Sequence, residues 1–297
     1  MKIFILSVSK SIYSTKRLVE EAENLGHQVI VVNHTKCTVK LGAHKPEIYL
    51  KGYNIIDFPD AIIPRIGTTV TRHGAAVVKQ FEMNGIYSTA RSLGILRSRN
   101  KVRTLQIMNR KHIPIPPTVF AINPQNIDAQ IALLGGPPVI IKLQEGTQGK
   151  GVILAESAQS AKSILDTFYK MDTSILMQQY IKESNGEDIR AFVVGHQVVA
   201  AMKRVGAEDD FRSNIHRGGH GEVVELTPKE RKIALKATQT LGLPVAGVDM
   251  IRSNSGPLLI EVNSSPGLEG IEATTKINIA QAIINHLEEN VRLKLQK

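Results

Sequence analysis

The sequence predicts a mixed α/β protein in which a small domain with a parallel sheet precedes a larger α+β unit. Short apolar runs alternate with helical segments early in the chain, and crossover helices are what join parallel strands. Aromatic residues are only 4% of the 297 residues and tryptophan is absent, while Val, Ile, Leu and Ala are plentiful. This balance suits sheets covered by helices.

A first domain is expected over residues 1–95. Its first apolar run, residues 2–8, is typical of a buried strand, and a helix from Ser14 to Leu25 should end at Gly26. Further strands are predicted at 28–32, 60–64 and 86–88, with a helix over 74–84. Strands that alternate with helices in this way predict a parallel sheet.

A central subdomain is expected over residues 96–182. It should begin with a helix from about Ser98 to Arg110, followed by a proline-rich linker at 113–117 that must be extended, because proline disfavours helix in the preceding residue. Strands are predicted near 138–143, 152–155 and 175–181, with a helix over 158–170.

A C-terminal subdomain is expected over residues 183–297. Thr227, Pro228 and Glu230 have the pattern of a capping box with proline in the first helical turn, so a helix should begin there. Strands are predicted near 189–195, 197–204, 246–252 and 257–262, a long polar stretch over 205–221, and a final helix over 277–294.

Charge and composition limit the class of protein. The net charge of +10 could attract an acidic partner such as a nucleotide, an acidic peptide or RNA, or could simply keep a basic protein solvated. Like charges form no run of five, and aromatic residues are few, so direct nucleic-acid binding is not expected. Cys37 is the only cysteine, which excludes an internal disulfide. Without a signal peptide or a run of about 18 apolar residues, we expect a cytoplasmic protein without membrane contact.

The strongest local signal is the pair Asp249 and Glu261. They lie in two apolar runs, equally far from Ser255, so a hairpin turn centred there would place them opposite each other, with Asn263 on the same face. Two adjacent carboxylates repel unless a hard cation lies between them, and oxygen ligands of this kind suit magnesium. The alternative is that each acid pairs with a nearby Lys or Arg.

A glycine-rich loop, residues 145–151, lies between two predicted strands. Its backbone N–H groups could lie over a triphosphate, although an ordinary hairpin turn is equally consistent. Lys150 is followed by Gly151 rather than Ser or Thr, so this is not a Walker A loop. Lys142 ends the preceding strand and Lys101 begins a helix; each could meet a phosphate or lie at the surface.

A third segment, residues 210–219, combines Arg212, Arg217, His216 and several glycines. Arginine suits phosphate and carboxylate through bidentate hydrogen bonds, but charged glycine-rich loops are common and the signal alone is weak. The chain contains no nucleophile elbow and no His–Glu zinc helix.

In their joint order these segments resemble the ATP-grasp superfamily, and specifically its RimK branch. The resemblance covers nearly the whole chain, including Pro64–Thr68 and Gln80–Met83 of the first domain. The motifs that carry it are Asn100-Lys101, Lys142 with the loop 145–151, Gln178–Ile181, Gly186–Arg190, Phe211–Asn214, Asp249 and Glu261–Gly267. It implies an ATP-grasp fold, in which two α+β subdomains grip ATP behind the small first domain.

The resemblance also implies roles for individual residues. ATP phosphates would contact Lys101, Lys142, Gly146, Gly149, Gly151, Arg212, Ser213 and Asn214. The adenine would lie against the hinge Gln179, Tyr180 and Ile181, and the ribose against Asp188. Two Mg²⁺ or Mn²⁺ ions would be held by Asp249, Glu261 and Asn263. Arg204, Arg212 and Arg217 are expected to hold substrate carboxylates or an acyl phosphate. Gln179 departs from the family, whose hinge often has an acidic residue there.

The implied activity is ligation of a carboxylate to an amine. Enzymes of the RimK branch add L-glutamate by α-linked amide bonds to the C-terminal glutamate of an acceptor, best known as a small-subunit ribosomal protein, through an acyl phosphate. The alternatives are a ligase for a small-molecule, coenzyme or peptide acceptor, and a nucleotide-dependent ribosome-binding protein without catalysis. The resemblance further implies a homotetramer or homodimer.

Overall fold

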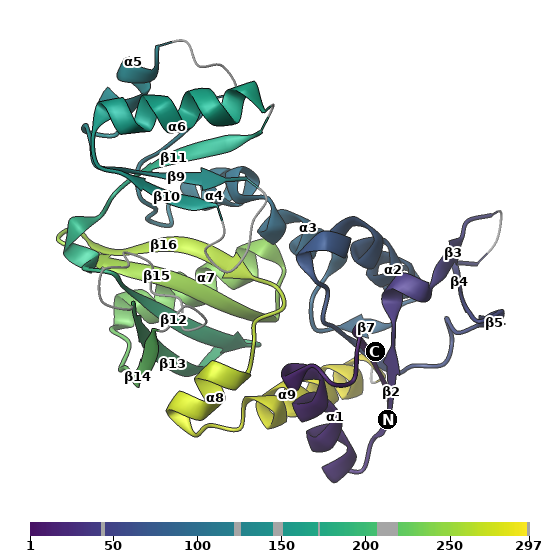
Figure 1. Cartoon of the computed structure of the whole chain (residues 1–297). Helices are drawn as coiled ribbons and strands as arrows, with labels where there is room; N and C mark the ends of the chain where they lie inside the picture. Colours follow the sequence, from purple (N-terminus) through teal and green to yellow (C-terminus); the bar gives the residue numbers. More distant parts are fainter. Residues whose placement is uncertain (43–44, 122–125, 145–150, 172, 207–218, 296–297) are drawn as a thin grey trace.

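The computed structural model describes residues 1–297 except 43–44, 122–125, 145–150, 172, 207–218 and 296–297. Three sheet-containing units follow one another along the chain (Figure 1). Within the described residues, no helix combines the length and apolar character that crossing a membrane requires.

The first unit contains the predicted parallel sheet, with strand order β2-β1-β6-β7. Alternate residues of β1 face opposite layers: Ile3 and Ile5 pack with α1 and α9, whereas Phe4 and Leu6 pack with α2. The elements are β1 (Lys2–Leu6), α1 (Tyr13–Asn24), β2 (Gln28–Val32), β6 (Ala61–Pro64), α2 (Thr71–Met83), β7 (Tyr87–Ser88) and α3 (Ser92–Arg99), with α9 (Ile279–Leu295) added from the end of the chain.

Three features of this unit and of the segment that follows it differ from the prediction. A small antiparallel sheet, order β3-β4-β5, was not predicted; its strands are Thr38–Lys40, Glu47–Leu50 and Tyr53–Asn54, and the short helices η1 (His34–Lys36) and η2 (Thr68–Val70) are also additional. The single helix predicted from Ser98 is instead the end of α3 and a separate helix, α4 (Lys101–Arg110). Asn100 leaves helical geometry and caps α4, its side chain accepting from the Arg103 N–H at 2.9 Å.

The central unit is a four-stranded antiparallel sheet of order β10-β9-β11-β8. Val139 and Ile141 of β9 pack with Ala161 and Leu165 of α6, so Lys142 points to the opposite face. The elements are β8 (Thr118–Phe120), α5 (Ile127–Ala132), β9 (Val139–Leu143), β10 (Val152–Ala155), α6 (Ala158–Lys170) and β11 (Ile175–Gln179). Residues 113–117 form no helix, as their prolines predicted.

The C-terminal unit is a five-stranded antiparallel sheet of order β14-β13-β12-β15-β16, preceded by η3 (Lys182–Ser184). Helix α7 covers one face, and its predicted capping box is present: Glu230 N–H donates to Thr227 Oγ1 at 3.2 Å and Thr227 N–H to Glu230 Oε2 at 2.8 Å. The elements are β12 (Glu187–Val194), β13 (Gln197–Val205), β14 (His220–Val223), α7 (Pro228–Leu241), β15 (Val245–Ser253), β16 (Gly256–Asn263) and α8 (Glu269–Thr275).

The hydrophobic clusters join the first and last units. Two clusters combine buried residues of the first unit with residues of the C-terminal sheet, α7 and α9, whereas a third cluster lies wholly within the central unit. In Figure 1 the central unit lies above the C-terminal sheet, and α9 runs beside α1. The first and C-terminal units therefore form one packed body.

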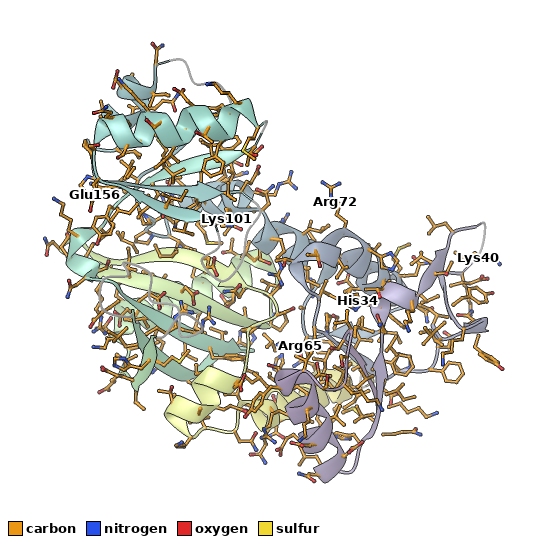
Figure 2. All side chains as sticks on the ribbon, in the orientation of Figure 1. His34, Lys40, Arg65, Arg72, Lys101 and Glu156 are labelled. Carbon is orange, nitrogen blue, oxygen red and sulfur yellow. The ribbon has the colours of Figure 1, made fainter. Side chains whose placement is uncertain are left out.

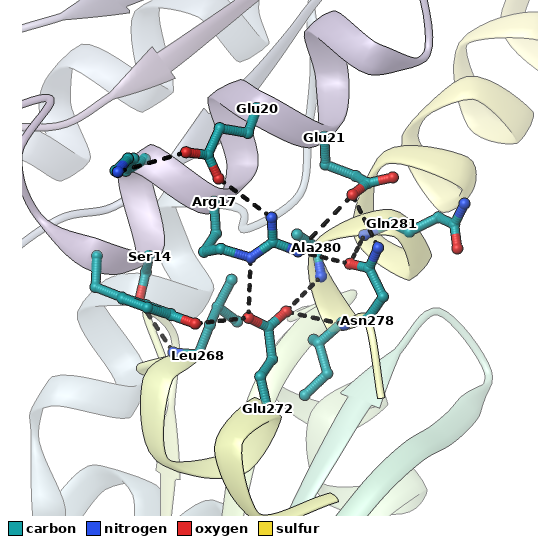
Figure 3. Close-up of polar contacts among 12 residues, drawn as sticks. Ser14, Arg17, Glu20, Glu21, Leu268, Glu272, Asn278, Ala280 and Gln281 are labelled. Atoms are coloured by element: carbon teal, nitrogen blue, oxygen red, sulfur yellow. Dashed lines mark hydrogen bonds and ion pairs between the residues drawn. The ribbon is translucent and has the colours of Figure 1, made fainter. Parts of the chain in front are cut away.

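A polar network at the α1 side completes this junction (Figure 3). Glu272 of α8 is 8% exposed and accepts from Arg17 Nε at 3.3 Å and from the N–H groups of Ile279 and Ala280 at 3.0 and 3.2 Å. The Leu268 N–H donates to Ser14 Oγ at 3.0 Å. One carboxylate thus satisfies the first turn of α9 and a cation of α1 together.

Replacing Glu272 by Ala should lower the free energy of unfolding by about 2 kcal/mol, because two buried N–H groups and Arg17 lose their acceptor. Urea denaturation followed by circular dichroism measures the change. Glu269→Ala, at an exposed position in the same helix, should have much less effect. Equal losses in the two variants would contradict the role given to Glu272.

Candidate active site

The predicted acidic pair is present on β15 and β16. Asp249 lies directly opposite Glu261, and Asn263 lies opposite Gly247. Asn263 Nδ2 donates to Glu261 Oε1 at 2.8 Å, so the three predicted metal ligands lie together on one face of the hairpin.

A β-bulge, absent from the prediction, produces this arrangement. The turn is centred between Asn254 and Ser255, since Ser253 pairs with Gly256, and a register shift next to Met250 then leaves Ile260 unpaired. Without the shift, Glu261 would share the face of Leu259, which packs in the hydrophobic core. The predicted pairing of the acids is confirmed, but the turn centre from which it was derived is half a residue off.

Asp249 is tied to arginines of the neighbouring strands. Arg190 on β12 donates to both carboxylate oxygens of Asp249, at 2.7 and 2.6 Å, and Arg204 on β13 approaches Oδ2 at 2.9 Å. Arg204 also donates to Asp188 from Nε at 2.6 Å. The guanidinium of Arg204 is therefore bound by two carboxylates, and its predicted contact with a substrate stays a prediction.

These ion pairs keep Asp249 charged. Burial of the side chain, which is 5% exposed, opposes ionisation, but the guanidinium groups of Arg190 and Arg204 outweigh it and lower the pKa of Asp249 to about 2. For Asp249, the alternative in which the acid pairs with nearby arginines is therefore present in the structure. It does not exclude a metal ligand, because two carboxylate oxygens offer about four lone-pair positions.

Lys142 lies on the inner face of the central sheet, where its Nζ donates to Gln178 Oε1 at 2.7 Å. The Gln178 side chain is 3% exposed and in turn donates from Nε2 to Thr118 Oγ1 at 2.9 Å, which fixes the amide orientation. Burial lowers the pKa of Lys142 to about 8, with Lys101 lowering it further and Glu261 acting in the opposite direction. A lysine so perturbed fits an anionic ligand.

Lys101 of α4 and Glu261 of β16 both lie near enough to Lys142 of β9 to influence its pKa. Lys101, at the start of α4, donates to the Gln144 carbonyl at 3.3 Å, and Figure 2 places it beside the central sheet. Arg99, two residues earlier, is also influenced by the Glu261 carboxylate. Lys101, Lys142 and Arg99 thus surround the Glu261 carboxylate with an excess of positive charge. A bound polyphosphate would balance this charge.

The predicted hinge and the described end of the glycine-rich loop flank this region. Gln179 ends β11 and its N–H donates to the Pro117 carbonyl at 2.9 Å; Tyr180 and Ile181 follow. Gly151 has φ +73°, and a Cβ there would lie 2.4 Å from Leu143 Cδ1, so only glycine fits. Its carbonyl accepts from the Leu143 N–H at 2.8 Å, which closes the loop between β9 and β10.

Several predicted residues lie outside the described part of the chain: Gly146, Gly149, Arg212, Ser213, Asn214 and Arg217. Their assignments stay predictions. In the described part, no group of three or more His, Cys, Asp or Glu side chains could hold a metal ion, and Asp249, Glu261 and Asn263 stay the predicted metal ligands.

Sequence reasoning assigned no role to four residues of this region: Arg65, Arg99, Gln178 and Arg190. A signal existed for Arg190, because it follows Asp188 by two positions on a strand and so shares its face. Arg65 donates to the Pro266 carbonyl in the segment after β16, and Arg99 donates to the Ile66 carbonyl within the first unit; no local pattern reveals these contacts.

Comparisons with family models and with known proteins identify the family of this chain. Residues 98–287 match the RimK-like ATP-grasp domain, and residues 1–95 match the RimK PreATP-grasp domain. A "Probable alpha-L-glutamate ligase" of Picosynechococcus sp. is 54% identical over 290 residues, 98% of this chain and 96% of the relative. A protein of the same description from Aliivibrio fischeri is 50% identical over 297 residues, 100% and 98% of the two chains.

Solved structures confirm the predicted ATP-grasp fold. The ATP-grasp ligase PsnB, complexed with a minimal precursor, superposes with a TM-score of 0.77 at 19% identity, covering 97% of this chain and 98% of PsnB. D-alanine–D-alanine ligase from Bacillus anthracis, complexed with ATP, gives a TM-score of 0.70 at 18% identity, covering 100% and 99% of the two chains.

Replacing Gln178 by Leu should lower the free energy of unfolding by about 1–3 kcal/mol, because the Lys142 ammonium and Thr118 hydroxyl lose their shared partner. Chemical denaturation at pH 7 measures this difference. Gln197→Leu makes the same change at an exposed position of β13 and should have little effect. If the Gln178 variant is as stable as the wild type, the hydrogen bonds of Gln178 to Lys142 and Thr118 do not contribute to stability.

Proposed function

Because the chain belongs to the RimK family of ATP-grasp ligases, we propose that it is an ATP- and magnesium-dependent α-L-glutamate ligase. The observation that carries the proposal is that Lys142 lies close enough to Lys101 and to Glu261 for both to influence its pKa, while Asp249 lies opposite Glu261 and Asn263 donates to it. The names of relatives that are 50% and 54% identical over nearly the whole chain support glutamate as the added amino acid.

Different described residues would bind the phosphates, the adenine and the ribose of ATP. Lys101 and Lys142 would contact the phosphates, which would compensate the buried charge of Lys142. The backbone of Gln179, Tyr180 and Ile181 would lie along the adenine, as the family resemblance implies. Asp188 would reach the ribose while the pair with Arg204 holds its carboxylate in place.

Glu261, Asn263 and Asp249 are the residues that would hold magnesium or manganese. The bound cation would neutralise phosphate charge as it develops during transfer. Hydrogen bonds and ion pairs fix the orientation of the two carboxylates: Arg190 and Arg204 bind Asp249, and Asn263 donates to Glu261.

The proposed reaction has two steps. A carboxylate of the acceptor attacks the γ-phosphate of ATP, the bond to the β-phosphate oxygen breaks, and an acyl phosphate and ADP form. The amine of glutamate then attacks the acyl carbon, phosphate leaves, and an amide bond forms with loss of a proton from the amine. Lys101 and Lys142 would stabilise the charge on the transferred group.

The acceptor that we propose is a polypeptide that ends in glutamate, with a small-subunit ribosomal protein as the first to be tested. A net charge of +10 favours encounter with an acidic acceptor, and each added glutamate would increase the acceptor's negative charge. A coenzyme or small-molecule acceptor remains the alternative that the same assay tests.

Glu261→Gln should reduce glutamate addition by roughly 100-fold or more, because it removes a ligand charge while keeping the shape of the side chain. The measurement is mass spectrometry of candidate acceptors after incubation with ATP, magnesium and glutamate. Mass gains in steps of one glutamyl unit are expected with the wild-type enzyme.

The matched control for this variant is Glu269→Gln, an exposed position in α8. It should leave addition unchanged. If the wild type modifies no acceptor yet forms ADP with another amino acid, the glutamate assignment fails while the ATP-grasp chemistry stands. Full activity of Glu261→Gln would remove this residue from the metal site.

ATP binding should weaken roughly tenfold per pH unit above pH 8, because neutral Lys142 must take up a proton to meet phosphate. Its pKa lies near 8 in the folded chain against an ordinary 10.5. Between these values the folded chain binds fewer protons than the unfolded chain, so this group makes folding more favourable as pH rises, opposite to the trend in ATP affinity. Calorimetry in buffers of different ionisation enthalpy should detect proton uptake, and its absence in wild type would contradict the prediction.

A further inference from the structure

Two arginines meet where the first unit touches the segment after β16. Arg65, directly after β6, donates from Nη2 to the Pro266 carbonyl at 2.7 Å. Arg99, at the end of α3, donates from Nη2 to the Ile66 carbonyl at 2.9 Å. Figure 2 shows Arg65 at the junction of the first and C-terminal units.

In the part of the chain that the structure describes, neither arginine forms an ion pair with a carboxylate. Among the described residues, neither guanidinium lies within 4.0 Å of an Asp or Glu oxygen. Burial lowers the pKa of Arg65 to about 10, with Arg99 lowering it further; burial also lowers the pKa of Arg99, and the Glu261 carboxylate acts in the opposite direction. Two like charges held together in this way favour an anion between them.

Three polar groups, one on Arg99 and two on the residues just before Pro266, are buried without a partner among the described residues. Arg99 Nε and the hydroxyls of Ser264 and Ser265 are enclosed, and no hydrogen-bond partner is found for them in the described part of the chain. Unsatisfied buried donors are rare in folded proteins. A guanidinium edge with two hydroxyls matches the oxygens of a carboxylate, which accepts several hydrogen bonds at once.

The position of these groups connects them to the proposed reaction. Ser264 and Ser265 directly follow Asn263, and Glu261 is close enough to Arg99 and to Lys142 to influence both. The pair of arginines therefore lies beside the region given to the phosphates and metal, and not in the hydrophobic interior.

We propose that Arg65, Arg99, Ser264 and Ser265 bind a substrate carboxylate that does not react, namely a glutamate side chain. This inference rests on the proposed function. Glutamate side chains come from two sources, the incoming amino acid and the C-terminal residue of the acceptor, and both present the same chemistry to the two arginines.

The test compares Glu with Gln at each position, in the wild type, Arg99→Gln and Arg110→Gln. Arg110 is exposed on α4, so its variant makes the same charge change outside the site. The substrates are L-glutamate or L-glutamine as the added amino acid, and synthetic peptides ending in Glu or Gln as acceptors. The ratio of kcat/KM for Glu over Gln is the quantity measured.

In Arg99→Gln, the preference for Glu should fall roughly tenfold or more at one position, since a charged hydrogen bond to the side chain is lost. The position that changes identifies the source of the carboxylate. Arg110→Gln should keep both preferences. A lower kcat in Arg99→Gln with both preferences unchanged would overturn the proposal, because a residue that only supports the fold alters both substrates equally.

Failure of the proposed function gives a different result. If the wild type adds no glutamate to any acceptor, binding of glutarate, followed by calorimetry, tests the site without turnover. Glutarate binding that is lost in Arg99→Gln and kept in Arg110→Gln would support the carboxylate site. Equal binding by all three proteins, or none by the wild type, would overturn it.

Discussion

The buried carboxylate of Asp249 is the group on which the inner face of the C-terminal sheet depends. Arg190 and Arg204 reach it from two other strands, and Asp188 holds the far side of Arg204. Removing one partner of such a buried pair commonly costs about 3–5 kcal/mol, because a charge is left uncompensated. Three strands of one sheet are thus fixed relative to one another by charges that also line the site.

The surrounding geometry follows from which face each side chain occupies. Strict alternation places Lys142 and Gln178 on the inner face of the central sheet, opposite the face that packs on α6. On β16 alternation alone would bury Glu261, and one bulge at Ile260 turns it toward Asp249. A single extra residue in a strand therefore decides whether this hairpin presents one carboxylate or two.

Much of this architecture could be predicted from local patterns. The strands at 28–32 and 152–155 and the helix at 158–170 lie where apolar periodicity predicted them, and the capping box fixed the start of α7. The small sheet β3-β4-β5 was missed because its strands are short and half exposed. Arg65 and Arg99 were missed because their setting depends on a segment distant in sequence, and local periodicity carries no information about such packing.

The shared hydrophobic clusters have a consequence for the order of events during synthesis. Ile3 and Ile5 pack with α1, which follows soon after them in the chain, and with α9, which begins only at Ile279. During synthesis this face of β1 therefore lacks part of its apolar cover until α9 has been made. The central unit, whose cluster draws on no residue outside itself, can close much earlier. The central unit should thus fold before the first unit is complete.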